Sequence, residues 1–149
     1  MQLSRCLLPA LLGAILLASA TTQLHAQRLT VRIEGIRSTE GLLHVGFYDS
    51  AEQWHSEKSN FQRHGDKTEI QDGIVTIIFD DVPPGHYAAA LVDDENGNGH
   101  IDWGIIVPKE GFGFSNYEHR GLFRPKFEDF DFVLEADKDL TIVMKVRYI

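Results

Sequence analysis

The chain has 149 residues, of which 43% are hydrophobic and 24% charged, and its formal net charge at pH 7 is −8. This length and composition are typical of one folded domain of ordinary size. No cluster of Lys and Arg offsets the acidity, which argues against nucleic-acid binding because contacts with phosphates require such clusters.

Residues 1–26 have the pattern of a secretory signal peptide. Arg5 precedes an apolar run over 7–18, and small residues follow at Ala20 and Ala26. We expect cleavage after Ala26 rather than Ala20, giving a periplasmic or secreted protein. The apolar run is shorter than the roughly 20 residues of a membrane span, so we expect no span after cleavage; a retained anchor helix is the alternative. Cleavage also removes Cys6, the only cysteine.

The rest of the chain, 27–149, is predicted to be a single all-β domain. Short apolar segments, most of them with apolar residues at alternate positions, are separated by turns rich in Gly and Pro, which indicates an antiparallel β-sandwich of about seven strands. The predicted strands are 28–36, 41–48, 73–79, 87–92, 130–134 and 140–148, with a brief candidate at 104–107. The segment 87–92 is apolar on both faces, which favours an interior strand.

One short helix is expected between the second and third of these strands. Ser50 and Gln53 have the spacing of a capping box, with Trp54 and Phe61 on one helical face. We interpret this segment as a lid or crossover on the sandwich.

The strongest motif is an acidic loop over residues 94–102. Oxygen-bearing side chains stand at alternate positions and a glycine follows, as in the first half of the EF-hand calcium loop. The twelfth position, which should carry a bidentate Glu, is Ile105, and the flanks are predicted strands. The sequence therefore predicts a calcium loop of EF-hand-like local design placed between strands.

Calcium takes about six to eight oxygen ligands, and this loop offers five of them. The predicted ligands are Asp94, Asn96, Asn98, Asp102 and the backbone carbonyl of His100. Asp93, Glu110 and Glu118 are candidates for the missing ligand. The alternative is a plain turn without metal, because Asn-Gly is a strong turn signal by itself.

Three stretches resemble one bacterial family: 82–88, which reads Val-Pro-Pro-Gly-His-Tyr-Ala; the acidic loop with Asp102; and 108–116, which reads Pro-Lys-Glu-Gly-Phe-Gly-Phe-Ser-Asn. On these motifs the chain is similar to an exported family known as domain of unknown function 2141 (DUF2141). The resemblance implies an immunoglobulin-like or transthyretin-like β-sandwich. Its Pro-Pro-Gly-x-Tyr turn and acidic loop also resemble calcium-stapled modules of surface adhesins. The resemblance implies no activity.

A glycine- and aromatic-rich stretch over 111–117 is the candidate ligand-binding surface. Rings exposed between glycines can stack on a sugar or a peptide. The candidate residues are Trp103, Phe112, Phe114 and Tyr117. Alternatively, these rings fold back and cover the open end of the core.

We therefore expect an exported module that binds another envelope protein or a polysaccharide and is not an enzyme. The first alternative is a metal-dependent, hydrolase-like enzyme on the acidic loop face, with His100, Asp102, Glu110 and His119 around a transition metal. A purely structural envelope domain is the second. A triad of Ser115, His119 and Asp129 has little support, because the chain has no nucleophile elbow around that serine.

Overall fold

The computed structural model describes residues 27–99, 101–105 and 108–149. The predicted signal peptide, His100 and the second half (106–107) of the strand candidate at 104–107 lie outside these residues. Within them the chain forms eight strands, one α-helix and one 3-10 helix. In chain order these are β1 (Leu29–Glu34), β2 (Leu42–Tyr48), α1 (Ala51–Ser56), β3 (Phe61–Gly65), β4 (Ile74–Phe79), β5 (Gly85–Asp94), β6 (Gly111–Phe114), η1 (Phe127–Asp129), β7 (Asp131–Leu134) and β8 (Leu140–Lys145).

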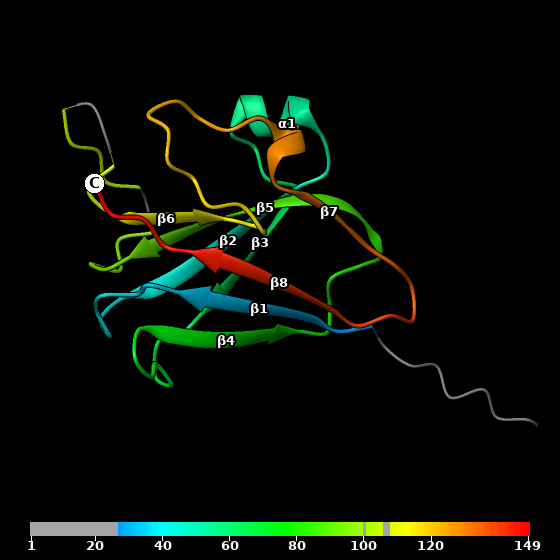
Figure 1. The fold of residues 1–149 in the computed structure, drawn as a ribbon, viewed down its shortest axis with the longest axis horizontal. Coiled ribbons are helices and arrows are strands. Elements are labelled where there is room, and N and C mark those ends of the chain that lie inside the picture. The colour runs from blue at the N-terminus through cyan, green and yellow to red at the C-terminus, as the bar shows by residue number, and fades with distance from the viewer. Residues whose placement is uncertain (1–26, 100, 106–107) are drawn as a thin grey trace, which may run out of the picture.

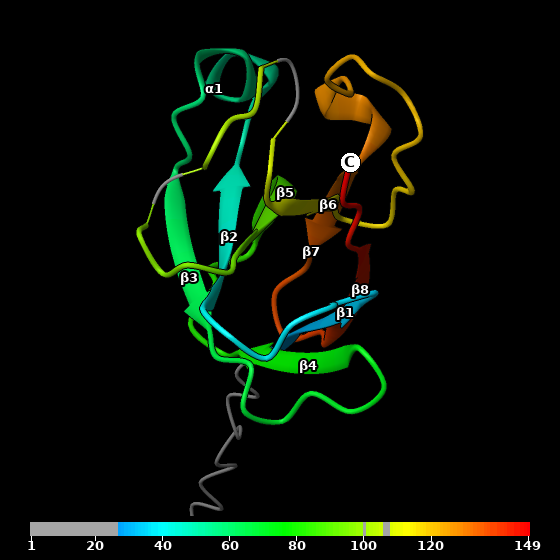
Figure 2. The same ribbon diagram turned by 90° about the vertical axis from the view of Figure 1, so that its left-hand side faces the viewer.

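The strands form two sheets that face one another (Figures 1 and 2). The three-stranded sheet has the order β4-β1-β8, and the five-stranded sheet has the order β3-β2-β5-β6, with β7 also pairing β5. This arrangement confirms the predicted all-β sandwich and the interior position of the segment 87–92. One detail differs from an all-antiparallel sandwich, because β1 and β8 pair in parallel, with Leu29 opposite Leu140.

The main core lies between the two sheets and follows from the alternation in the sequence. Val31 of β1, Val45 of β2 and Ile142 of β8 are fully buried there, while their chain neighbours point away. Complete burial of such a side chain contributes roughly 1.5–3 kcal/mol to folding. The sandwich therefore rests on side chains that the period-two pattern identifies.

A second, smaller cluster covers part of the outer face of the five-stranded sheet. Trp54 of α1, Phe114 of β6 and Phe130 after η1 pack there, with Trp54 and Phe130 ring centroids 5.0 Å apart. In Figures 1 and 2, α1 and η1 lie side by side on this outer face. The helix thus covers the sandwich as predicted, and it also buries its tryptophan.

Two predictions about local structure are wrong. Phe61 is not on the helix, because α1 ends at Ser56 and Glu57 turns into the left-handed region at φ 58°. It begins β3 instead, where it stacks on Phe47 at 4.8 Å. The stretch 111–114, expected to be part of a binding loop, is strand β6. The described residues contain no helix long and apolar enough to cross a membrane.

Candidate functional site: the acidic loop and the outer cleft

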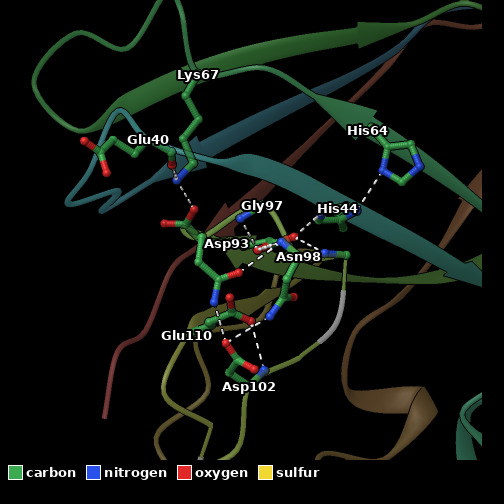
Figure 3. A network of polar contacts seen from close by, with 12 residues as sticks. Glu40, His44, His64, Lys67, Asp93, Gly97, Asn98, Asp102 and Glu110 are labelled. Carbon is green, nitrogen blue, oxygen red and sulfur yellow. Dashed lines mark hydrogen bonds and ion pairs between the residues drawn. The ribbon is translucent and has the colours of Figure 1, made fainter.

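The acidic loop leaves the end of β5 and returns to the sheet as β6. Its base is formed by Asp93 and Asp94, the last two residues of β5. Because successive residues of a strand point to opposite faces, these two carboxylates enter different environments. Figure 3 shows the polar network around both.

The carboxylate of Asp94 holds the turn of the loop by accepting hydrogen bonds from the backbone of the loop. Its carboxylate is almost fully buried and accepts hydrogen bonds from the N–H groups of Gly97 at 2.7 Å, Asn98 at 3.2 Å and Gly99 at 2.7 Å. The Nε2 atom of His44 lies 3.0 Å from its Oδ2. Burial by itself raises the pKa of Asp94, but these hydrogen bonds outweigh it and the pKa lies below its usual range.

Three predicted ligands converge at the tip of the loop. The side-chain amides of Asn96 and Asn98 donate to Oδ2 of Asp102, at 2.5 and 3.1 Å. Oδ1 of Asn96 in turn accepts from the backbone of Asn98 at 3.0 Å. The alternating spacing therefore does direct these side chains to one point. His100, the fifth predicted ligand, lies outside the described residues.

Glu110 is the candidate extra ligand that the structure brings to this group. Its Oε2 accepts from the backbone N–H of Asp102 at 3.1 Å, while Oε1 is buried without a hydrogen-bond donor. Its pKa is raised, first by burial and then by the charges of Asp94 and Asp102. Once protonated it hydrogen-bonds the Asp94 carboxylate, which raises the pKa further. Glu110 thus occupies a buried environment in which the charged groups that act on it are the carboxylates of Asp94 and Asp102.

The other two candidates for the missing ligand are directed elsewhere. Asp93 points to the inner side of the sheet, where it forms a fully buried ion pair with Lys67 and accepts a hydrogen bond from the Tyr148 hydroxyl. Burial and this carboxylate raise the pKa of Tyr148. Glu118 pairs with Arg120 at 2.8 Å and Lys145 at 3.1 Å. Neither carboxylate therefore lies with the loop oxygens as a ligand for the same cation.

A pair of histidines extends the network beyond the loop. His44 on β2 and His64 on β3 are directly opposite in the register, and their Nδ1 atoms are 2.8 Å apart. No sequence pattern grouped these two histidines, because β3 was not predicted. Alternation in β2 places His44 on the outer face, but its partner becomes evident only when the strand containing His64 is known.

A cleft of about 380 Å³ opens on the outer face of the five-stranded sheet, beside the loop. Its floor is recessed because Gly46 and Ala90, which are register partners, carry small or no side chains. Tyr48 and Trp54 form one wall and Trp103 stands at another. The polar side chains that line it are His44, Glu57, Gln62, Asp94, Glu110, His119 and Arg124.

One wall of the cleft is rigidly held. The Trp54 indole N–H donates to the carbonyl of Pro125 at 2.7 Å, and the Arg124 guanidinium lies 3.5 Å from the indole ring centroid. Arg124 also pairs with Glu57 at 2.9 Å. The wall therefore presents an aromatic ring next to a fixed pair of charges.

The predicted aromatic surface is divided between core and cleft. Phe114 is buried in the second cluster, and Phe112 and Tyr117 are half-buried against it. Trp103, by contrast, is 61% exposed at the cleft. Part of the stretch therefore packs in the second cluster on the outer face and not over the open end of the main core, whereas Trp103 is exposed at the cleft.

Among the described residues, neither of the two catalytic arrangements weighed from the sequence is assembled, and His100 of the second lies outside them. Ser115 is fully buried, where its hydroxyl donates to the carbonyl of Phe130 at 2.5 Å and accepts from the backbone of Ala89 at 3.0 Å. The His119 ring lies among Phe112, Phe114 and Tyr117. Among the described residues, no three His, Cys, Asp or Glu side chains are arranged as a metal site.

Fold and site together define a two-sheet β-sandwich with an acidic loop and a cleft on the outer face of its larger sheet. The chain belongs to a family described as uncharacterized protein conserved in bacteria (DUF2141), which matches residues 31–142. The match includes both sheets, the acidic loop and the cleft residues up to Pro125. Comparison with curated proteins and with solved structures gave no match.

Proposed function

We propose that this protein is an exported, calcium-stabilised module that binds a segment of polysaccharide in the outer cleft and does not transform it. The observation that carries the proposal is the cleft itself, with its small-residue floor and its aromatic and charged walls. Concave sites of a few hundred Å³ take small ligands or single segments of a polymer, whereas protein partners dock on broader surfaces.

The composition of the walls favours a saccharide. A sugar ring presents an apolar C–H face, which stacks on an aromatic side chain, and a rim of hydroxyls, which need hydrogen-bond partners. Trp103 offers an exposed ring, and Gln62, Glu57 and Arg124 offer polar groups at the cleft. This combination of an apolar platform and directed polar groups is typical of sites that hold a polar ligand in a defined orientation.

Calcium fits the loop because the loop supplies hard oxygen ligands and because residues 94–102 include no Lys or Arg. Asn96, Asn98 and Asp102 already converge, and Glu110 adds a buried oxygen without a donor. The amides of Asn96 and Asn98 turn their oxygens toward a cation by rotation about the terminal bond. A divalent ion held by these residues would neutralise Asp102 and Glu110 and fix the long connection from β5 to β6.

The calcium part is tested by thermal unfolding of Glu110→Gln with excess EDTA and with calcium. In EDTA the variant should be at least as stable as the wild type, because it removes a buried charge that faces two other carboxylates. In calcium it should lose most of the stabilisation, which is about 1.4 kcal/mol for the wild type at ten times the Kd. Glu118→Gln, an exposed carboxylate away from the loop, is the control and should behave like the wild type in both conditions. Equal melting temperatures of the wild type with calcium and with EDTA would overturn the calcium part.

The saccharide part is tested with soluble fragments of bacterial envelope polysaccharides, titrated by calorimetry. Trp103→Ala should weaken binding at least tenfold without changing the melting temperature, since Trp103 is exposed. Phe123→Ala is the matched control, because Phe123 is an even more exposed ring, at 89% against 61% for Trp103, and does not line the cleft. Equal loss in both variants, or no binding to any fragment, would overturn this part.

A hydrolase is the second candidate, and one observation favours it. Asp94 and Glu110 line the cleft with pKa values displaced in opposite directions, which is a feature of carboxylate pairs in acid–base catalysis. Against it, the Asp94 carboxylate is almost fully buried and already accepts three backbone hydrogen bonds. Release of reducing ends from the bound fragments by the wild type, and not by Glu110→Gln, would establish the hydrolase in place of the binding module.

A further inference from the structure

We propose that the cross-strand pair His44 and His64 binds a divalent transition-metal ion, Cu(II) first among them, through the two Nδ1 atoms. The pair lies on the outer face of β2 and β3, beside the acidic loop (Figure 3). His44 and Asp94 also line the cleft, but the two Nδ1 atoms are not used by the proposed calcium ion or the saccharide, and the metal site rests on neither of those proposals.

The two imidazoles are brought together by the sheet and not by flexible side chains. His44 and His64 are direct register partners, with ring centroids 4.6 Å apart and planes at 84°. The backbones of two paired strands therefore fix both rings. Imidazole nitrogen is a good ligand for copper, nickel and zinc.

Asp94 provides the outer-shell partner that metal-binding histidines usually have. Its Oδ2 lies 3.0 Å from Nε2 of His44, so the ionised carboxylate keeps the proton on that nitrogen. The Nδ1 atom of His44 then carries the lone pair, directed toward His64. Such carboxylate–histidine pairs fix the tautomer and the orientation of a ligand, and their loss costs 10–100-fold in metal affinity.

The separation of the two nitrogens selects the kind of metal. Two ligand nitrogens about 2.0 Å from an ion and at right angles to each other lie about 2.8 Å apart, whereas tetrahedral geometry places them about 3.3 Å apart. The Nδ1 atoms of His44 and His64 are 2.8 Å apart. The pair therefore fits two adjacent positions of a tetragonal site, which Cu(II) and Ni(II) prefer, and copper binds such ligands more tightly than nickel.

The site is open on its remaining side. His64 is exposed on strand β3 at the edge of the five-stranded sheet, and the side chain of His44 is about one-fifth exposed. An ion enters without unfolding the sheet, and the proton that the two Nδ1 atoms otherwise share moves through water to Nε2 of His64, so that both rings bind the ion as neutral imidazoles. Water completes its coordination.

The test is a titration of the metal-free full chain with Cu(II), followed by calorimetry and by electron paramagnetic resonance. The wild type should bind one ion with two equatorial imidazole nitrogens. His64→Ala should weaken binding at least tenfold and leave one such nitrogen, with an unchanged melting temperature in the absence of metal.

His86→Ala is the matched control. His86 is also an exposed strand histidine with a carboxylate partner, since its Nε2 lies 2.7 Å from Oδ2 of Asp131, but its ring packs against Phe127 and, within the described part of the chain, against no second imidazole. Its loss should leave the affinity within twofold of the wild type. Wild-type affinity in His64→Ala, or the same loss in both variants, would overturn the proposal.

Discussion

The ammonium group of Lys67 and the carboxylate of Asp93 form an ion pair in which neither side chain is exposed to solvent. Lys67 also donates to the carbonyl of Glu40 at 2.5 Å, and Asp93 accepts from the hydroxyl of Tyr148. Segments from four parts of the chain therefore meet at the base of the acidic loop, directly behind Asp94.

Replacement of Lys67 by Met should destabilise the fold by about 3–5 kcal/mol, because it leaves Asp93 buried without a countercharge. Urea denaturation measures the change. Arg32→Gln is the control, since Arg32 and Glu34 form a partly exposed pair worth about 0–1 kcal/mol. Replacing Asp93 by Leu as well should recover much of the loss. A Lys67→Met variant as stable as the wild type would show that the pair does not hold the base of the loop.

Gly41→Ala should be far more destabilising than Gly97→Ala. Both glycines have positive φ, 78° and 69°, so both substitutions cost about 1–2 kcal/mol of backbone strain. A β-carbon on Gly41 would in addition overlap the carbonyl of Asp94, whereas one on Gly97 would meet open space. Urea denaturation of the two variants provides the comparison, and equal stabilities would contradict the close approach of Gly41 to the loop.

Asp94→Asn should make the free energy of unfolding less dependent on pH in the acid range. The pKa of Asp94 is lowered in the folded state, so its contribution is complete above the unfolded value of about 3.9 and is lost as the pH falls through the folded value. Without calcium, the variant should be less stable at pH 7 and should lose less stability than the wild type below about pH 4. Chemical denaturation across pH 2–7 measures the stability of both proteins. If both lose stability equally below about pH 4, the lowered pKa of Asp94 is contradicted.

Ser115→Ala should cost about 1–3 kcal/mol, because it leaves the buried N–H of Ala89 and the carbonyl of Phe130 without their hydroxyl partner. Ser38→Ala is the matched control: the Ser38 hydroxyl also accepts from a backbone N–H, that of Glu40 at 3.1 Å, but it is exposed. Its effect should stay within about 0.5 kcal/mol. If the two variants are equally stable, Ser115 has no structural role of this kind.

Strong alternation of apolar and polar residues along the chain made much of the sandwich predictable. Val31, Val45 and Ile142 each stand in a run whose every second residue is apolar, and all three are fully buried. The spacing of Asn96, Asn98 and Asp102 likewise predicted that their side chains meet. These features depend on residues close together in the chain, which is where sequence patterns are informative.

The features that were not predicted depend on neighbours distant in the chain. Strand β6 reads Gly-Phe-Gly-Phe, a pattern of weak strand propensity. Its glycines are needed because Val146 and Tyr148 approach Gly111, and the backbone of Lys145 approaches Gly113. Strand β3 has one large apolar residue, Phe61, and without that strand the pairing of His44 with His64 could not be found.

The parallel pairing of β1 with β8 also bears on how the chain folds. Leu29 and Leu140 lie side by side although nearly the whole domain separates them, so β1 finds that partner only after the last strand is available. Contacts between such distant residues slow folding, which in β-sandwiches takes milliseconds to seconds. A chain shortened before β8 should therefore leave the three-stranded sheet without one edge, and the native fold should form only after β8 has been synthesised.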